Sequence, residues 1–254
     1  MNTRITHVLA MIAVFACILF CASCKKKSTG TPAPVVTCTS CVTTPDAVAA
    51  YDNSSKGIYK GTVVGSSGTI KFNIGNNDST ITATMVINDT TVMLTASVSW
   101  TSGVAYVSPF TGTLGGAAVS ITFSVGADGT NPTVTAASIP GHPNAVLNVT
   151  KETSTNLIMV FEGTYADNSS SGDRGTFDLF LSKVLKKWTI TSKSSVDPTK
   201  SSDNINGTFD NNTNTLSYTD GSGGVLTGTL SGDKITGTYN GGGNSGTFTA
   251  TRTL

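Results

Sequence analysis

The sequence has few charged residues and almost no glutamate. Asp, Glu, Lys and Arg make up 12% of its 254 residues, about half the fraction usual in soluble domains. Glu occurs only twice. Helical bundles and coiled coils are built largely from Ala, Glu, Lys, Leu and Arg, so this composition excludes both. The formal net charge of +1 provides no basic surface of the kind that binds nucleic acid, so we expect no nucleic-acid partner.

Residues suited to catalysis or metal binding are also scarce. The chain has two His, and its five Cys all lie at or before Cys41. His142 stands in a Pro/Gly turn, and no Gly-x-Ser-x-Gly motif marks a nucleophile. Glycosidases need two carboxylates in a rigid cleft, whereas we expect Glu152 and Glu162 both to be solvated. The sequence therefore predicts a protein that is not an enzyme and carries no cofactor.

Threonine, by contrast, is abundant. It occurs 43 times, more often than any other residue, and β-branched residues favour strands. From Gly57 onward apolar residues alternate with Thr or Ser, for example in 81–87, 92–100 and 119–125. This alternation gives each strand one apolar and one hydroxyl-rich face, which is typical of an antiparallel sheet with one buried face. The predicted fold class is all-β, an antiparallel meander of about 13 to 15 strands that forms a barrel or a sandwich.

One pattern recurs three times after Gly57. A Gly-x-Tyr segment is followed by a Gly-Thr segment that ends on an aromatic or aliphatic residue, and we expect each copy to be a β-hairpin in which Gly admits a neighbouring ring. The spacing favours two β modules, 57–182 and 183–254. The alternative is a single meander whose first and last strands pair. The copies are Gly57-Ile58-Tyr59 with Gly68-Thr69-Ile70, Gly163-Thr164-Tyr165 with Gly175-Thr176-Phe177, and Gly237-Thr238-Tyr239 with Gly246-Thr247-Phe248.

These hairpins and their spacing are loosely similar to those of lipocalin-like and avidin-like meander barrels. The chain lacks a Gly-x-Trp opening motif. The similarity therefore concerns the general shape and indicates no specific family for the β region.

The N-terminus contains a long hydrophobic run at residues 8–20, preceded by Arg4 and followed by Cys21-Ala22-Ser23-Cys24. A helix of this length spans about 20 Å, which is short for a bilayer core of about 30 Å but usual for a signal peptide. The small residues before Cys24 resemble the lipobox of bacterial lipoproteins, although Cys21 replaces the usual Leu. The alternative is an ordinary secretory peptide that leaves a soluble protein.

The lipoprotein resemblance implies that residues 1–23 are a signal peptide and that Cys24 is acylated with fatty acids such as palmitate. Lys25 follows Cys24 in place of the Asp that retains lipoproteins at the inner membrane. The resemblance thus predicts a lipid anchor in the outer membrane of a Gram-negative cell envelope and makes the membrane a partner. It leaves open whether the protein faces the periplasm or the cell surface.

Residues 24–56 are expected to form a flexible tether, because they are rich in Pro, Ser and Thr and have no apolar period. A short helix is predicted at 44–50, where Thr and Pro can start it. Cys38 and Cys41 form a C-x-x-C pair in this segment. A zinc site would need two further ligands and a redox motif would open a helix, so the prediction is a local disulfide.

One loop has the spacing of a calcium site. Asp167, Ser169, Ser171, Asp173 and Asp178 match ligand positions 1, 3, 5, 7 and 12 of an EF-hand loop. The predicted flanks are strands, and the last residue is Asp where EF-hands have Glu. The alternative is a hairpin loop, which uses the same residue types.

Two functions remain open. The first is a binding module for a small apolar ligand or a glycan, enclosed by residues 57–182 with Trp100 nearby, while the C-terminal module is tighter and mainly structural. The second is a structural or adhesive envelope protein whose Thr and Ser faces meet other surfaces. Trp100 and Trp188 both continue apolar strand faces, so core packing is the default role for each.

Overall fold

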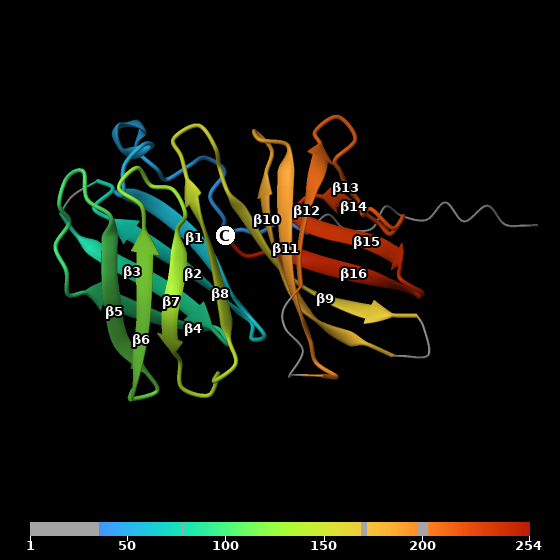
Figure 1. Ribbon diagram of the computed structural model, residues 1–254, viewed down its shortest axis with the longest axis horizontal. Helices are drawn as coiled ribbons and strands as arrows, with labels where there is room; N and C mark the ends of the chain where they lie inside the picture. Colours follow the sequence, from blue (N-terminus) through green and yellow to red (C-terminus); the bar gives the residue numbers. More distant parts are fainter. Residues whose placement is uncertain (1–35, 78, 169–171, 198–202) are drawn as a thin grey trace, which may run out of the picture. The chain divides into compact units, whose positions relative to one another are not determined.

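The computed structural model describes residues 36–254 except 78, 169–171 and 198–202. Within these residues the chain forms strands β1 to β16 and one 3-10 helix, η1 (Ala49–Tyr51). All the strand pairs are antiparallel, and the protein is all-β, as the alternation of apolar and hydroxyl residues predicted (Figure 1). The helix begins later and is shorter than the one expected at 44–50.

The first eight strands form one sheet in the order β7-β6-β5-β4-β3-β2-β1-β8. Each strand pairs with the next, except that β8 returns to pair with β1 along its length. The sheet curls so that its end strands β7 and β8 lie near each other (Figure 1). The bounds are β1 (Gly57–Val64), β2 (Gly68–Ile74), β3 (Ile81–Ile87), β4 (Thr90–Ala96), β5 (Tyr106–Leu114), β6 (Ala117–Val125), β7 (Thr133–Ser138) and β8 (Val146–Glu152).

Aromatic side chains fill the interior of this sheet. The ring of Phe72 stacks on Phe123 with centroids 4.5 Å apart, and meets Phe110 edge-on at 5.0 Å. Tyr59 packs on Phe123 at 5.0 Å, and all four rings are fully buried. They come from inward positions of β1, β2, β5 and β6, so the predicted apolar face is the core face.

The last eight strands close into a barrel in which β9 pairs with both β10 and β16. The change from sheet to barrel therefore falls between Glu152 and Met159, earlier than the module boundary expected at residue 182. The reason is that the second and third copies of the glycine pattern share one barrel, with Tyr165 of β9 paired to Phe248 of β16. The bounds are β9 (Met159–Asp167), β10 (Arg174–Ser182), β11 (Lys187–Ser194), β12 (Asp203–Asp210), β13 (Thr215–Thr219), β14 (Val225–Ser231), β15 (Lys234–Gly241) and β16 (Asn244–Arg252).

Glycines of the barrel lie directly opposite aromatic residues on the neighbouring strand. A side-chain carbon at Gly163 would meet the Phe177 ring at 2.7 Å, closer than real side-chain carbons come. Glycine is therefore required wherever a ring crosses the adjacent backbone, as expected for these hairpins. The pairs are Gly163 with Phe177, Gly175 with Tyr165, Gly207 with Trp188, Gly237 with Phe248 and Gly246 with Tyr239.

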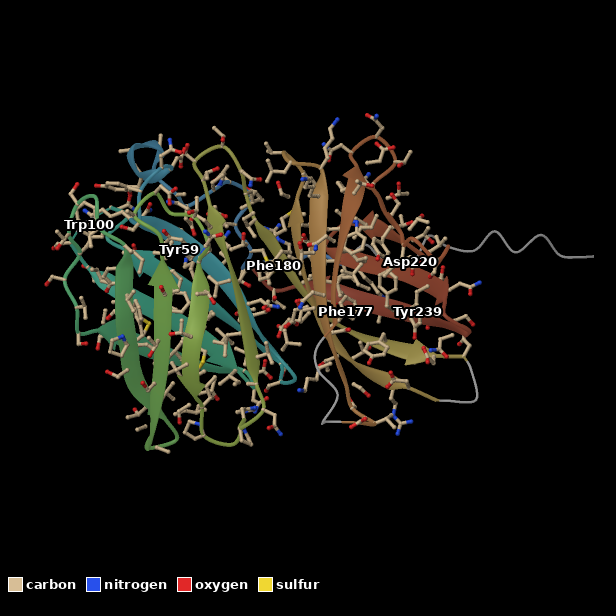
Figure 2. All side chains as sticks on the ribbon, viewed as in Figure 1. Tyr59, Trp100, Phe177, Phe180, Asp220 and Tyr239 are labelled. Carbon is tan, nitrogen blue, oxygen red and sulfur yellow. A yellow bond between two sulfur atoms is a disulfide. The ribbon has the colours of Figure 1, made fainter. Side chains whose placement is uncertain are left out.

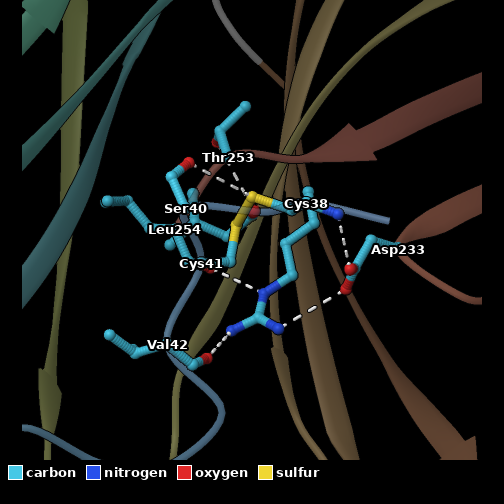
Figure 3. Close-up of a disulfide and its surroundings, with 9 residues drawn as sticks. Cys38, Ser40, Cys41, Val42, Asp233, Thr253 and Leu254 are labelled. Carbon is cyan, nitrogen blue, oxygen red and sulfur yellow. Dashed lines mark hydrogen bonds and ion pairs between the residues drawn. A yellow bond between two sulfur atoms is a disulfide. The ribbon is translucent and has the colours of Figure 1, made fainter. Parts of the chain in front are cut away.

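The described part of the expected tether, residues 36–56, is ordered and packs against the β region, so the flexible-tether prediction is wrong for it. Cys38 and Cys41 are joined by a disulfide, and the Cys38 backbone N–H donates to Asp233 at 2.8 Å (Figure 3). The buried guanidinium of Arg252 donates to the Val42 carbonyl and forms an ion pair with Asp233 at 3.4 Å. Charged side chains at one end of the barrel thus satisfy the backbone of this segment.

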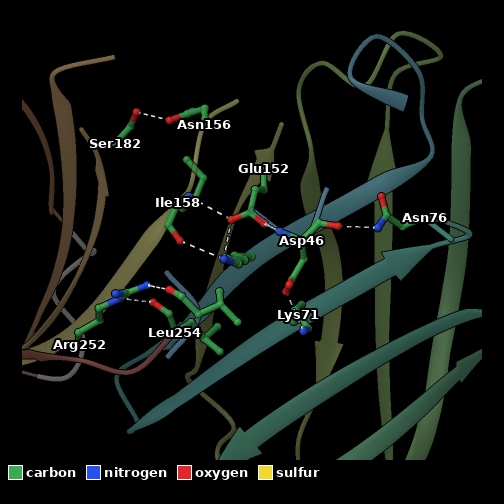
Figure 4. Close-up of polar contacts among 11 residues, drawn as sticks. Asp46, Lys71, Asn76, Glu152, Asn156, Ile158, Ser182, Arg252 and Leu254 are labelled. Carbon is green, nitrogen blue, oxygen red and sulfur yellow. Dashed lines mark hydrogen bonds and ion pairs between the residues drawn. The ribbon is translucent and has the colours of Figure 1, made fainter. Parts of the chain in front are cut away.

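The same segment also contacts the first sheet, at a carboxylate that belongs to a buried ion pair. Lys60 Nζ lies 2.5 Å from a Glu152 oxygen, and both side chains are at most 1% exposed. Glu152 also accepts hydrogen bonds from the Asp46 N–H at 2.8 Å and the Ile158 N–H at 3.1 Å (Figure 4). The prediction that Glu152 is solvated is therefore wrong: its carboxylate joins β1, β8, the N-terminal segment and the link to β9.

Candidate functional site

A cavity of about 470 Å³ opens at one end of the barrel. The labels of Phe177, Tyr239 and Asp220 in Figure 2 mark its position among β10, β15 and the end of β13. Its wall combines aromatic and aliphatic side chains with a few polar ones. The main wall residues are Tyr165, Asp167, Asp173, Phe177, Ile190, Ser192, Ile205, Tyr218, Asp220, Val225, Leu226, Tyr239, Asn240, Asn244 and Phe248.

The opposite end of the barrel is filled. Trp188 is 1% exposed, its ring lies over Gly207, and its indole N–H donates to the Thr208 carbonyl at 2.8 Å. Phe209 and Leu216 pack into the same core. The barrel is therefore a cup, with a closed end of large apolar side chains and an open end lined by tyrosines and carboxylates.

Hydrogen bonds hold the polar groups of the open end in place. The Tyr239 hydroxyl donates to Asp167, and Ser194 Oγ donates to Asp173 at 2.6 Å. Asp220 Oδ1 accepts from the Ser222 hydroxyl at 2.7 Å and from the Gly224 N–H at 2.7 Å. These hydrogen bonds lower the pKa of Asp220, the one from the Ser222 hydroxyl most. Asp220 is therefore ionised at neutral pH.

The surroundings of Tyr239 in the cup raise the pKa of its hydroxyl. Burial raises its pKa above the ordinary value, and the hydrogen bond to Asp167 and the negative charges of Asp167 and Asp173 raise it further. The hydroxyl is therefore neutral and acts as a donor at neutral pH. Its ring meets Tyr165 edge-on, with centroids 6.4 Å apart.

Trp100 lies elsewhere, at the edge of the first sheet's core. Its indole N–H donates to Ser55 Oγ at 2.8 Å, and Lys56 Nζ sits 4.6 Å from its ring centroid. It borders a smaller depression of about 340 Å³. The larger cavity is in the C-terminal barrel and not beside Trp100, so the expectation of a tight C-terminal module is wrong. Aromatic rings fill the interior of the first sheet, whereas one end of the barrel is open.

The structure separates one of the predicted calcium ligands, Asp178, from two of the others. Asp167 and Asp173 both line the cup, but Asp178 lies on the outer face of β10, because an offset of five residues reverses the face of a strand. Ser169 and Ser171 lie outside the described residues. Across the part of the chain that is described, no group of three or more His, Cys, Asp or Glu is arranged to hold a metal ion.

Asp178 instead forms a buried carboxyl pair that sequence reasoning missed. It lies directly opposite Glu162 of β9 on the barrel face that packs against β1, and it is 4% exposed. Burial, and next the charge of Glu162, raises the pKa of Asp178 to about 8. Burial also raises the pKa of Glu162, which accepts a hydrogen bond from the Gly68 N–H. Glu162 is therefore not the solvated residue that we expected.

The remaining candidates contribute no further site. Cys24 lies outside the described residues. His142 is in an exposed turn, where Nε2 lies 3.3 Å from Asn88 Nδ2. No helix in the described ranges is long and apolar enough to cross a membrane. Comparisons with protein-family models, curated proteins and solved structures found no match for this chain.

Proposed function

We propose that this chain is a non-catalytic binding protein that holds a small ligand in the open end of its C-terminal barrel. The observation that carries this proposal is the cavity of about 470 Å³ between Tyr165, Tyr218 and Tyr239. Small-molecule sites usually measure about 300–1,000 Å³ and have apolar walls with a few fixed polar groups. The cup has both properties.

The ligand classes that fit are a small apolar molecule and a glycan. The rings of Phe177 and Phe248 offer apolar surface inside the cup, and the half-buried tyrosines offer faces on which a sugar ring can stack. Asn240 and Asn244 stand exposed at the rim, where their amides can bond ligand hydroxyls. These groups suit the binding of a ligand, and hydrogen bonds hold the carboxylates and the Tyr239 hydroxyl of the cup in place.

The test is a ligand screen with a matched pair of variants. Thermal melting and titration calorimetry of the full chain would cover neutral oligosaccharides, fatty acids and small amines. We expect at least one class to bind saturably and raise the melting temperature. Tyr218→Ala removes a half-buried ring of the cup and should weaken binding about tenfold or more, whereas Tyr51→Ala removes a ring beside the first sheet and should not. Binding unaffected by Tyr218→Ala, or no binding at all, would reject the site.

We also propose that Cys24 carries a lipid anchor. The support is the hydrophobic run at 8–20, the small residues Ala22 and Ser23, and the cysteine itself. The β region carries almost no net charge, so acyl chains and not electrostatic attraction would hold the protein at the outer membrane. An anchor of this kind would display the cup at the cell envelope.

A structural or adhesive role is the second candidate, and exposed threonines favour it. Thr227 and Thr229 of β14, Thr236 and Thr238 of β15, and Thr247 and Thr249 of β16 stand in register on the outside of the barrel. Such rows of hydroxyls could contact another surface. This candidate takes precedence if the screen finds no ligand for the cup.

A further inference from the structure

We propose that the ligand of the cup carries a positive charge and is an organic amine or quaternary ammonium compound. This inference rests on the proposed binding function and adds the chemical class of the ligand. It is carried by the combination of aromatic rings and three carboxylates around one cavity whose described lining includes no Lys or Arg.

The aromatic part of the site consists of two edge-to-face ring pairs. Tyr165 and Tyr239 meet with centroids 6.4 Å apart, and Phe177 and Phe248 at 5.6 Å. Tyr218 adds a fifth ring to the wall. The faces of such rings carry negative electrostatic potential and attract ammonium groups, most strongly where water is excluded. Phe177 and Phe248 are 2% and 5% exposed, so these packed rings close the floor of the cup.

The charged side chains among the described lining residues of the cup are all acidic. Asp167, Asp173 and Asp220 line the cavity, and none of the described lining residues is Lys or Arg. Arg174 follows Asp173 in the chain, but it lies outside the lining and is exposed. Burial raises the pKa of Tyr239 most, and the hydrogen bond to Asp167 and the charges of Asp167 and Asp173 raise it further. A fatty acid or other anion would therefore meet repulsion there, and a cation would meet attraction.

The experiment compares two probes that differ in charge and share a shape. Choline and 3,3-dimethylbutan-1-ol have the same skeleton, with a quaternary nitrogen in the first and a carbon in the second. Calorimetric titration of the full chain at low ionic strength should show choline binding about tenfold more tightly or better. Raising the salt concentration should weaken choline binding and leave the alcohol unchanged.

Asp167→Asn removes one charge and keeps an oxygen that can accept the Tyr239 hydroxyl. We expect it to weaken choline binding about five- to tenfold and to leave the alcohol unaffected. The matched control is Asp210→Asn, which makes the same charge change at the other end of the barrel, beyond the cavity lining. Thermal melts of both variants establish that they are folded.

The possible results separate the two proposals. Equal affinity for choline and the alcohol, or equal weakening by both Asn variants, would overturn the cationic ligand and leave the binding function standing. So would binding of a neutral disaccharide such as maltose, sensitive to Tyr218→Ala, in a protein that ignores choline. A protein that binds no probe of any charge would overturn both proposals.

Discussion

Replacing Asp178 with Asn should stabilise the folded protein, and the gain should grow as the pH rises. The carboxyl has a pKa of about 8 in the folded state and an ordinary value of 3.8. Because the folded pKa is raised, the stability that protonated Asp178 contributes is complete below pH 3.8 and is lost as the pH rises to 8. The loss is about 1.4 kcal/mol per pH unit, so the wild type should lose about 4 kcal/mol between pH 5 and pH 8 from this group.

The structural cause of this instability is the desolvation of Asp178 beside Glu162. The Asp178 Oδ2 atom and the Thr62 hydroxyl oxygen are both buried without a hydrogen-bond partner among the described residues. The Glu162 carboxylate accepts the Gly68 N–H, and its charge opposes ionisation of Asp178. An Asn at position 178 has the same shape, cannot ionise and offers an N–H that Thr62 can accept.

The assay is urea unfolding of wild type and Asp178→Asn at pH 5, 6, 7 and 8. The difference in unfolding free energy should widen steadily with pH. The control is Asp210→Asn, at an exposed turn where hydrogen bonds from Asn212 and Thr213 lower the pKa of Asp210. Its offset from wild type should stay constant over this range. If the Asp178→Asn and wild-type curves were parallel as well, the carboxyl would titrate normally and the reasoning would be refuted.

Two further predictions concern the barrel and the N-terminus. Gly237→Ala places a methyl group against the Phe248 ring and the Thr227 carbonyl, so urea unfolding should show a loss of about 1–3 kcal/mol. Gly221→Ala, which points into open space, should change little, and equal effects of the two would contradict the ring-over-glycine argument. Cys24→Ala should abolish fatty-acid labelling and release the protein from the membrane fraction. A variant that still labels, or a wild type that never does, would remove the lipid anchor.

The sequence predicted those features that depend on neighbouring residues. Alternation of apolar and hydroxyl residues in 81–87 and 119–125 correctly located strands β3 and β6 and their buried faces. The glycine pattern correctly indicated hairpins in which Gly lies beside a ring, as in Gly163 with Phe177. Both features follow from side-chain direction and size within one strand pair, so they are readable from a short stretch of sequence.

Features that depend on distant pairing were not predictable. The pairing of β8 with β1 and of β16 with β9 sets the limits of the two sheets, and no local pattern specifies either partner. The docking of residues 36–56 depends on Glu152 and Arg252, which come from a strand end of each sheet. Their burial reflects contacts formed over more than 100 residues of sequence. Composition, which suggested a tether, reflects none of these contacts.

The location of the cavity illustrates a separate physical point. Strands rich in Gly and Thr suggest a tight module, because small side chains can approach closely. A closed barrel cannot contract in this way, since its diameter is set by the number and tilt of its strands. Eight strands close this barrel, and an eight-stranded interior is just wide enough to be filled by side chains or to hold one small ligand. Where Trp188, Phe209 and Leu216 point inward the interior is filled; towards Gly224 and Tyr239 it stays open. Small inward residues in a closed barrel therefore predict a cavity, whereas the same residues in an open sheet predict close packing.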